Sequence, residues 1–524
     1  MSESITGPIT GPMGIARGTV TEGSTVRWRD KKRYLWLIGL VVPSLAFIAI
    51  GMWKLTGWGA WFWIGPIVIL AIVPAIDLFA GVDRSNPPDD VIETLEKDQY
   101  YRWVTYVFLP IQYVGFVGAF WVMTHYDLSV IDRVGIAISI GCIGGIGINT
   151  AHKLGHKKEA NERWLSKIAL AQSFYGHFYI EHNRGHHVRV ATPEDPASAR
   201  MGENFYQFWP RTVGGSLRSA WGLEKKRIAR RKEHPWRLSN DVLNAWLMSA
   251  ALWAAMIALF GIGIAPYLVI QAVVGFSLLE VVNFMEHYGM LRQKVGVGER
   301  ERYERVGPSH SWNSNNIATN VLLYHLQRHS DHHANPTRRY QSLRDFEESP
   351  VLPTGYAGMI VLAIVPAVWR RVMDPRVLRH FDGDLTRANL SPRKRDKILT
   401  KYGVAPTMAT KPPATAGGAA REPERTSRGL AAVAATAFSD HGAARPTRRP
   451  SPEGSPATPT DSPADEALTW RCPGCGFTYD VVSGEEREGF AAGTSWSEIP
   501  GSWCCPDCGV RDKADFIPTD RAFA

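Results

Sequence analysis

The sequence predicts an all-α membrane protein with six transmembrane helices, a histidine-rich helical cap on the cytoplasmic side and a small metal-binding domain at the C-terminal end. Two observations predict this fold class. Long apolar stretches lie almost entirely before residue 290, and five of the six cysteines lie between Cys472 and Cys508. The mean hydropathy of the 524 residues, −0.15, resembles that of a soluble protein. This average therefore combines a membrane domain with polar segments.

Six apolar stretches of about 20 residues are long enough to cross a bilayer core of about 30 Å as helices. One such stretch is also typical of a buried core helix, but six in series favour a membrane domain. Trp and Tyr side chains lie at several of the ends, as interfacial anchors do. The predicted spans are residues 34–53, 59–80, 103–124, 128–149, 243–263 and 264–286.

The distribution of Lys and Arg predicts the orientation of these spans. Residues 150–240 hold 17 Lys and Arg against 8 Asp and Glu, and five further basic residues lie within 27–33. Because basic loops stay on the cytoplasmic side, we expect both termini and the metal sites to lie there, in the inner (cytoplasmic) membrane. The net charge of +9 is then explained by a membrane surface, and no nucleic acid is expected as a partner. Residues 1–30 have no apolar core and predict no cleavable signal peptide.

Composition divides the chain into four parts. Residues 405–467 contain 16 Ala and 10 Pro, with Phe438 as their only aromatic residue, and cannot build a core. We therefore expect a disordered linker there. Within residues 205–227, aromatic residues alternate with basic ones, which fits a helix in the lipid interface as well as a solvated basic helix. The expected parts are a polar tail (1–30), a membrane domain (31–402), the linker (403–467) and a small domain (468–520).

Nine of the 16 histidines are clustered at recurring spacings. Residues three or four apart share a helix face, so each group is expected to direct its imidazoles at one point. Nine neutral nitrogen donors exceed what one metal coordinates, which implies two ions. The other seven, His325 among them, are expected to be surface or structural residues. The candidate ligands are His152, His156, His182, His186, His187, His287, His329, His332 and His333.

Four carboxylates lie close to these histidines in the sequence. A ligating imidazole usually donates its second nitrogen to such a group, so we expect these residues to orient the ligands. They are Glu181, Glu286, Asp195 and Asp331.

These residues carry a resemblance to a known family. His152-x-x-x-His156, Glu181-His182-x-x-Gly185-His186-His187 and Leu326–His333 resemble the three histidine boxes of integral-membrane di-iron hydroxylases and desaturases. Asn283–Gly289 resembles the further motif that separates alkane 1-monooxygenases from desaturases. The similarity covers about residues 30–400. One departure is Lys153, where the family generally has Glu.

The C-terminal cysteines form two CxxC pairs, Cys472–Cys475 and Cys505–Cys508, in the pattern of a tetrahedral sulfur site. We take Cys505 rather than its neighbour Cys504 as a ligand, because only 505–508 reproduces the CxxC spacing. Spacing alone fits a zinc ribbon equally well. The residues around the pairs, including Tyr479-Asp480 and Trp503, resemble rubredoxin, a carrier of one electron on one iron. The resemblance implies that Cys472, Cys475, Cys505 and Cys508 hold this iron.

Together the two resemblances imply an alkane 1-monooxygenase fused to its own rubredoxin. Such an enzyme converts n-alkanes from the lipid phase into 1-alkanols, with O2 as co-substrate at two histidine-ligated iron ions. Electrons would come from a separate NAD(P)H-dependent flavin reductase, because the chain has no dinucleotide-binding fingerprint. Residues 468–524 carry a net charge of −4 and residues 150–240 one of +9, which favours docking of the two.

Three alternatives remain at this point. The chain could be a fatty-acyl desaturase, or a hydroxylase of another hydrocarbon such as an aromatic methyl group. It could also be a membrane protein for metal storage or sensing, although such a protein needs no redox carrier.

Overall fold

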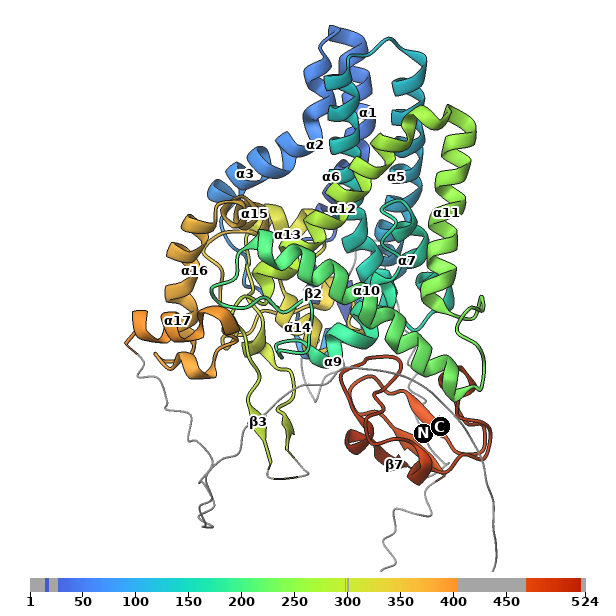
Figure 1. Cartoon of the computed structure of the whole chain (residues 1–524), viewed down its shortest axis with the longest axis vertical. Helices are drawn as coiled ribbons and strands as arrows, with labels where there is room; N and C mark the ends of the chain where they lie inside the picture. The colour runs from blue at the N-terminus through green and yellow to red at the C-terminus, as the bar shows by residue number, and fades with distance from the viewer. Residues whose placement is uncertain (1–14, 18–26, 297, 299–300, 404–467, 520–524) are drawn as a thin grey trace, which may run out of the picture.

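The computed structural model describes residues 15–17, 27–296, 298, 301–403 and 468–519. Nearly all of the linker expected at 403–467, and most of the expected N-terminal tail, lie outside these residues. The predicted fold class is confirmed, since helices dominate the described residues and a small sheet lies near the C-terminal end (Figure 1).

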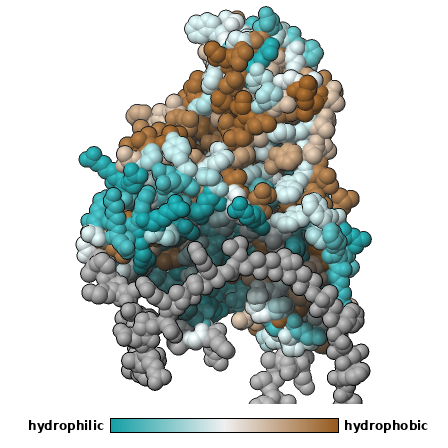
Figure 2. All heavy atoms as spheres, in the orientation of Figure 1, coloured by the Kyte–Doolittle hydropathy of each residue, from teal (hydrophilic) through white to brown (hydrophobic). Residues whose placement is uncertain are grey.

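Among the described residues, six helical segments are long and apolar enough to cross a membrane, so the chain is a multi-pass membrane protein. Three of them are composite: 3-10 turns precede α1 and α12, and a π-helical turn (Val68–Ile72) joins α2 to α3. Figure 2 shows an apolar surface over this upper part of the molecule and a polar surface beneath it. The helices are α1 (Val41–Thr56), α2 (Ile64–Ile67), α3 (Val73–Ala80), α5 (Gln99–His125), α6 (Val130–Gly155), α11 (Asp241–Phe260) and α12 (Ala265–Glu286).

The helix that contains the predicted fourth span, 128–149, extends beyond it at the C-terminal end. Helix α6 begins after Ser129, whose side chain accepts a hydrogen bond from the backbone N–H of Asp132 as a helix cap does. It then continues through the first pair of histidines to Gly155. The first histidine box is therefore the end of a membrane helix.

Helix α6 packs closely against α12 because two of its glycines have no side chain. A Cβ on Gly141 would lie 2.7 Å from the carbonyl oxygen of Gln271, and one on Gly145 would lie 2.9 Å from that of Gly275. Small residues of this kind let membrane helices approach backbone to backbone. The two helices that end at His156 and His287 are thereby held side by side.

The remaining helices form a cap below the spans (Figure 1). Helix α10 crosses the lower face and packs against α12, where Trp209 Nε1 donates to Ser277 Oγ at 2.9 Å. The sequence suggested two alternatives for residues 205–227, a helix in the lipid interface and a solvated helix. Neither alternative predicts that this helix packs against α12. The cap helices are α4 (Ile92–Lys97), α7 (Ala160–Ala171), α8 (Phe178–Ile180), α9 (His187–Arg189), α10 (Phe205–Arg230), α13 (Ile317–Leu322), α14 (His329–Ala334), α15 (Tyr356–Ile364), α16 (Pro366–His380) and α17 (Arg395–Lys401).

The strands are short and antiparallel. Two pairs, β1–β2 and β3–β4, lie in the N-terminal and middle parts of the chain, and a three-stranded sheet of order β6-β5-β7 lies in the C-terminal domain. The strands are β1 (Ile15–Arg17), β2 (Arg27–Arg29), β3 (Lys294–Val295), β4 (Arg302–Tyr303), β5 (Thr469–Arg471), β6 (Thr478–Asp480) and β7 (Ile517–Thr519).

A buried carboxylate joins the second span to the cap. Asp77 in α3 accepts a hydrogen bond from the backbone N–H of Thr319 at 3.0 Å and a second from the Thr319 hydroxyl. Thr319 lies in the first turn of α13, so Asp77 caps this helix from a distant part of the chain.

We expect Asp77→Ala to destabilise the protein by about 1–3 kcal/mol, because it leaves two buried donors without an acceptor. The measurement is the apparent melting temperature in detergent. Asp127→Ala is the control, since Asp127 is exposed in the turn between α5 and α6. Equal melting temperatures for the two variants would contradict the capping role.

Candidate metal centres

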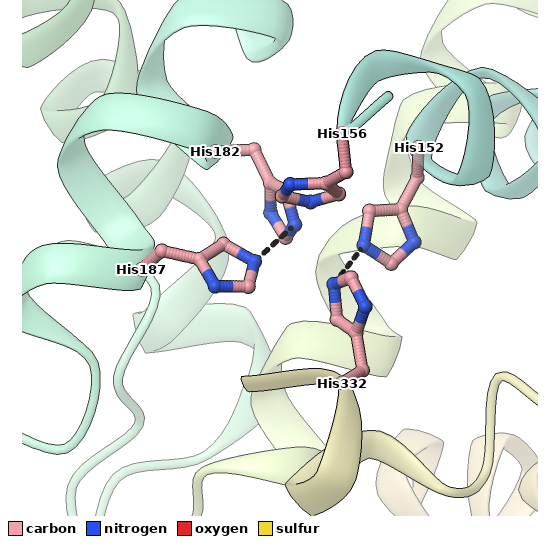
Figure 3. A group of neighbouring side chains, drawn as sticks. All are labelled: His152, His156, His182, His187 and His332. Carbon is pink, nitrogen blue, oxygen red and sulfur yellow. Dashed lines mark hydrogen bonds between the residues drawn. The ribbon is translucent and has the colours of Figure 1, made fainter. Parts of the chain in front are cut away.

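Five of the nine candidate histidines converge on one point. One ligand atom from each of them lies within 4.8 Å of the others, and all five residues are buried. Figure 3 shows their imidazoles pointing toward a common centre, from the end of α6, from the 182–187 segment and from α14. Nε2 of His152 lies 2.6 Å from Nε2 of His332, and Nε2 of His187 lies 3.1 Å from Nε2 of His182. The five are His152, His156, His182, His187 and His332.

The remaining four candidates form a second buried cluster. Nε2 of His333 lies 3.2 Å from Nε2 of His186 and 2.8 Å from Nε2 of His329. Nε2 of His329 in turn lies 3.3 Å from Nε2 of His287, directly after α12. The structure thus brings all nine predicted histidines into two clusters, which we call the five-histidine and the four-histidine cluster. His325 belongs to neither, and its Nδ1 contacts the carbonyl oxygen of Tyr340 at 3.0 Å.

The expectation that each histidine box points at one site is wrong for the second and third boxes. Residues Glu181–His186 form a π-helical turn, which has about one residue more per turn than an α-helix. His182 and His187 therefore face the five-histidine cluster, while His186 faces the other. In α14, His332 joins the first cluster and His329 and His333 the second. Sequence spacing could not reveal the division of the second box, because it depends on the π-helical turn.

The donor geometry of both clusters fits metal ions. Imidazole nitrogens bound to one ion at about 2.1 Å lie about 3 Å from each other. The Nε2–Nε2 separations of 2.6–3.3 Å are of this size. Without a cation, this many nitrogen lone pairs would face each other in a buried site, which is unfavourable.

The histidines are also in the protonation state that metal binding requires. Burial, together with repulsion from neighbouring histidines, lowers the pKa of His156, His182 and His332 well below the usual value, and lysine charges add to this for His156 and His332. Burial and the same kind of repulsion lower the pKa of His329 and His333. These rings are neutral at pH 7, so their lone pairs are available to a metal ion.

Of the four carboxylates, Asp195 holds a cluster histidine. Its Oδ2 lies 2.9 Å from Nδ1 of His186 and accepts from the Ser198 hydroxyl at 2.6 Å. Although burial opposes ionisation, the neighbouring His186 and these hydrogen bonds keep the pKa of Asp195 well below its usual range. An ionised carboxylate on Nδ1 leaves Nε2 of the ring free to face the four-histidine cluster.

Glu286 is placed differently. Its Oε2 lies 3.2 Å from Nε2 of His329, the nitrogen that faces the cluster, and its Oε1 has no hydrogen-bond partner among the described residues. Glu286 therefore contacts a cluster histidine, although it is not itself a member of the cluster. Its position as the last residue of α12 brings it there, and its expected role in orienting a ligand stays a prediction.

The other two carboxylates bond to arginines instead of cluster histidines. Asp331 accepts from Arg338 at 2.9 Å and from the backbone N–H of Arg344 at 2.8 Å. Glu181 pairs with Arg189 at 2.8 Å, and burial raises the pKa of Glu181 to about 8 against the effect of this cation. Neither is hydrogen-bonded to a cluster imidazole in the described part of the chain.

Lys153 stands at the position of the sequence departure, next to His152 of the five-histidine cluster. It is buried, and it lines a small cavity with Tyr101 and Gln341 on the side of α6 that faces α5. Its ammonium has no hydrogen-bond partner among the described residues.

An apolar cavity of about 80 Å³ reaches the two clusters from the membrane side. His152 of the five-histidine cluster and His329 of the other lie in its wall, as does Glu286. Most of the remaining wall is aliphatic and comes from both membrane and cap helices. Examples are Val68, Ile69, Leu278, Val282, Leu322 and Ile360.

The four predicted cysteines form a third candidate centre in the C-terminal domain. Sγ of Cys472 lies 3.8 Å from Sγ of Cys508, and Sγ of Cys475 lies 3.5 Å from Sγ of Cys505. Sulfurs at about 2.3 Å from a tetrahedral ion lie about 3.8 Å apart, so this geometry also fits a metal. Cys504 lies outside the group.

The cysteine domain lies against the histidine-bearing cap, below α9 and α10 (Figure 1). Glu488 is nine-tenths or more buried there and pairs with Arg184 at 2.8 Å and Arg230 at 3.1 Å. Arg487 donates to Oδ2 of Asp241 at 3.0 Å, while Oδ1 of the same carboxylate accepts from Lys167 at 2.6 Å.

Further polar contacts flank this interface. Arg302 pairs with Asp512 at 3.3 Å, Arg305 pairs with Asp515, and the Lys158 ammonium donates to the carbonyl oxygen of Cys475. Cations of the cap thus meet mainly anions of the cysteine domain, and screening by salt should weaken such an interface.

Comparisons with known proteins agree with these features. A family model described as fatty acid desaturase matches residues 133–363, and one described as rubredoxin matches residues 469–516. The alkane 1-monooxygenase of Acinetobacter baylyi is 48% identical over 396 residues, which cover 74% of this chain and 94% of the relative. An alkane 1-monooxygenase of Pseudomonas putida is 44% identical over 379 residues, covering 72% and 94%. The xylene/toluene monooxygenase hydroxylase component of Pseudomonas putida is 24% identical over 253 residues, covering 47% and 65%.

We expect Asp195→Ala to weaken metal binding at the four-histidine cluster by about 10–100-fold, because His186 loses the partner that orients it. The measurement is the metal retained per chain during titration with a chelator. Asp384→Ala is the control, since Asp384 is exposed. Equal retention by both variants would show that Asp195 does not support this cluster.

Proposed function

This chain belongs to the alkane 1-monooxygenase family, and from that premise we propose that it hydroxylates n-alkanes at the terminal carbon and receives electrons from its own rubredoxin domain. Its relatives and its histidine clusters support alkane hydroxylation. The terminal position, the two iron ions, the use of O2 and the route of the electrons are parts of the proposal.

The observation that carries the proposal is the apolar cavity that ends at both histidine clusters. An alkane has no polar group by which a protein could orient it. Selection of the terminal carbon must therefore come from the shape of an apolar cavity that allows only one end of the substrate to reach the metal site. The aliphatic wall, built from spans that lie in the lipid, suits a substrate that enters from the membrane.

The nine histidines would hold two iron ions, five residues on one and four on the other. Bound there, the iron pair would supply the activation of O2 and the removal of a hydrogen atom from the substrate. The chain's own residues perform the remaining tasks. Asp195 fixes the ring of His186, and the apolar wall excludes water from the site. Glu286 places a carboxylate oxygen where positive charge would gather.

The electron route is supported by the position of the rubredoxin domain. Its four cysteines would hold one iron, and the domain docks on the cap segment that also carries part of the five-histidine cluster. A rubredoxin carries one electron at a time, so a separate NAD(P)H-dependent flavin reductase would reduce it twice for each alkane hydroxylated. The basic cap supports a location on the cytoplasmic side of the inner membrane.

The test of this function is product analysis with ¹⁸O2. Purified protein would be supplied with NADH, a flavin rubredoxin reductase and a mixture of medium-chain n-alkanes. We expect ¹⁸O-labelled 1-alkanols by gas chromatography and mass spectrometry, and none from His333→Ala. Labelled secondary alcohols would refute the terminal position. Desaturated acyl chains, or turnover only with aromatic methyl groups, would favour one of the alternative enzymes.

The electron route is tested separately through the cysteines. We expect Cys475→Ser to abolish NADH-driven hydroxylation, because the rubredoxin iron loses a ligand, and an added separate rubredoxin to restore activity. Cys504→Ala is the matched control, because Cys504 is the cysteine of the same domain outside the cluster, and it should remain active. Unchanged activity of Cys475→Ser would contradict the route through the fused domain.

A further inference from the structure

We infer that electrons leave the rubredoxin domain at Gly509 and enter the five-histidine cluster through the segment of Asn183 and His187. The inference rests on the proposed electron route and deepens it. It names the point of exit, the point of entry and the cluster that receives the electron.

The two cysteine pairs of the rubredoxin domain end in equivalent glycines. Gly476 follows Cys475 and Gly509 follows Cys508, and both have a positive φ, of 75° and 65°. The N–H of Gly476 donates to the carbonyl oxygen of Cys472 at 2.9 Å, and that of Gly509 donates to Cys505 in the same way at 2.9 Å. By backbone conformation and hydrogen bonding, either glycine could serve as the exit.

The surroundings of the two glycines differ. A Cβ on Gly509 would lie 2.5 Å from the carbonyl oxygen of Asn183 and 3.7 Å from Cβ of His187. A Cβ on Gly476 would meet only Arg471 of its own domain, at 3.5 Å. Of the two glycines, only Gly509 touches the histidine-bearing segment. Glycine is required at this position because any side chain would push the two domains apart.

This contact links the two metal sites by few atoms. Gly509 is covalently joined to Cys508, a member of the cysteine cluster, and His187 belongs to the five-histidine cluster. The step on this path that crosses between the domains is the close approach of Gly509 to the carbonyl group of Asn183, which is bonded to His182 of the same cluster. From the five-histidine cluster the electron would then pass to the four-histidine cluster, through the histidine side chains that lie between the two.

The transfer is a one-electron step with no proton or bond change. The rubredoxin iron is oxidised from ferrous to ferric, and a ferric ion held by the five histidines is reduced to ferrous. The flavin reductase of the proposed function restores the ferrous rubredoxin. Two such transfers supply the two electrons of one turnover.

The test is the rate at which reduced rubredoxin iron is reoxidised within the full-length protein, followed by its visible absorbance after rapid photoreduction without alkane. We expect Gly509→Ala to slow this step about tenfold, because one added methyl group in a close contact weakens it by about that factor. Gly476→Ala is the matched control. It places the same residue in the same backbone conformation, where the added Cβ would meet only Arg471 of its own domain, so it should react as the wild type does.

A second control distinguishes the loss of the proposed electron exit from a general weakening of docking between the two domains. Gly489 also lies in the interface, where a Cβ would meet Cβ of Arg230 at 2.6 Å, away from His187. Gly489→Ala disturbs docking beside the Glu488–Arg230 ion pair, so it should slow the transfer more at high salt, where the remaining ion pairs weaken, than at low salt. Gly509→Ala should stay slow at every salt concentration. Equal rates for Gly509→Ala and Gly476→Ala would overturn the assignment of the exit.

The outcomes also distinguish this inference from the proposed function. If the wild-type rubredoxin iron is not reoxidised by the hydroxylase, the proposed route itself fails. A photo-crosslinking amino acid at position 183 gives a readout that needs neither metal nor turnover. We expect its crosslinks to map to residues 505–510, and crosslinks to the Gly476 loop instead would overturn the inference. This readout does not use the Gly509→Ala variant, so it still tests the inference if that variant fails to fold.

Discussion

The structure depends on one constraint: nine imidazoles must be brought together, neutral and away from water, in two adjacent groups. A neutral imidazole suits a metal ion, whereas a charged one in this site would repel its neighbours and the metal. Burial enforces neutrality, since it lowers the pKa of histidines such as His182 and His333. The cost is that every other buried polar group near the clusters needs a partner, which explains Asp195 on His186 and the arginines on Glu181 and Asp331.

The fold meets this constraint by combining regular α-helices with one irregular helical segment. Helices α6 and α12 carry His152 and lead to His287, and the glycines of α6 let the two helices pack closely. The segment between them cannot be a regular α-helix, since His182 and His187 are five residues apart and must share a side. A π-helical turn provides this spacing and leaves His186 for the other cluster. The same segment carries Asn183 and Arg184, which contact the rubredoxin domain.

The features that could be predicted from the sequence are those with a strong local pattern. Apolar length predicted six spans, and recurring spacing identified the nine histidines and four cysteines that now lie in three clusters. What could not be predicted depends on contacts between distant segments. The division of the second histidine box depends on a π-helical turn, the cap on α13 comes from Asp77 about 240 residues away, and Glu286 contacts His329 from the end of α12. Residues such as Thr319 and Ile360 line the cavity, but no sequence motif identifies them as cavity residues.

Asp241 gives the interface a thermodynamic role. This carboxylate begins membrane helix α11, and it bonds both Lys167 of the cap and Arg487 of the rubredoxin domain. A group shared by a folding contact and a docking contact couples the two free energies, and the coupling is reciprocal. Docking therefore stabilises the junction of α7 and α11, and a well-formed junction presents the carboxylate that Arg487 binds. The carrier acts as an intramolecular ligand of the membrane domain, whose resistance to unfolding should rise and fall with the fraction of time the carrier is bound.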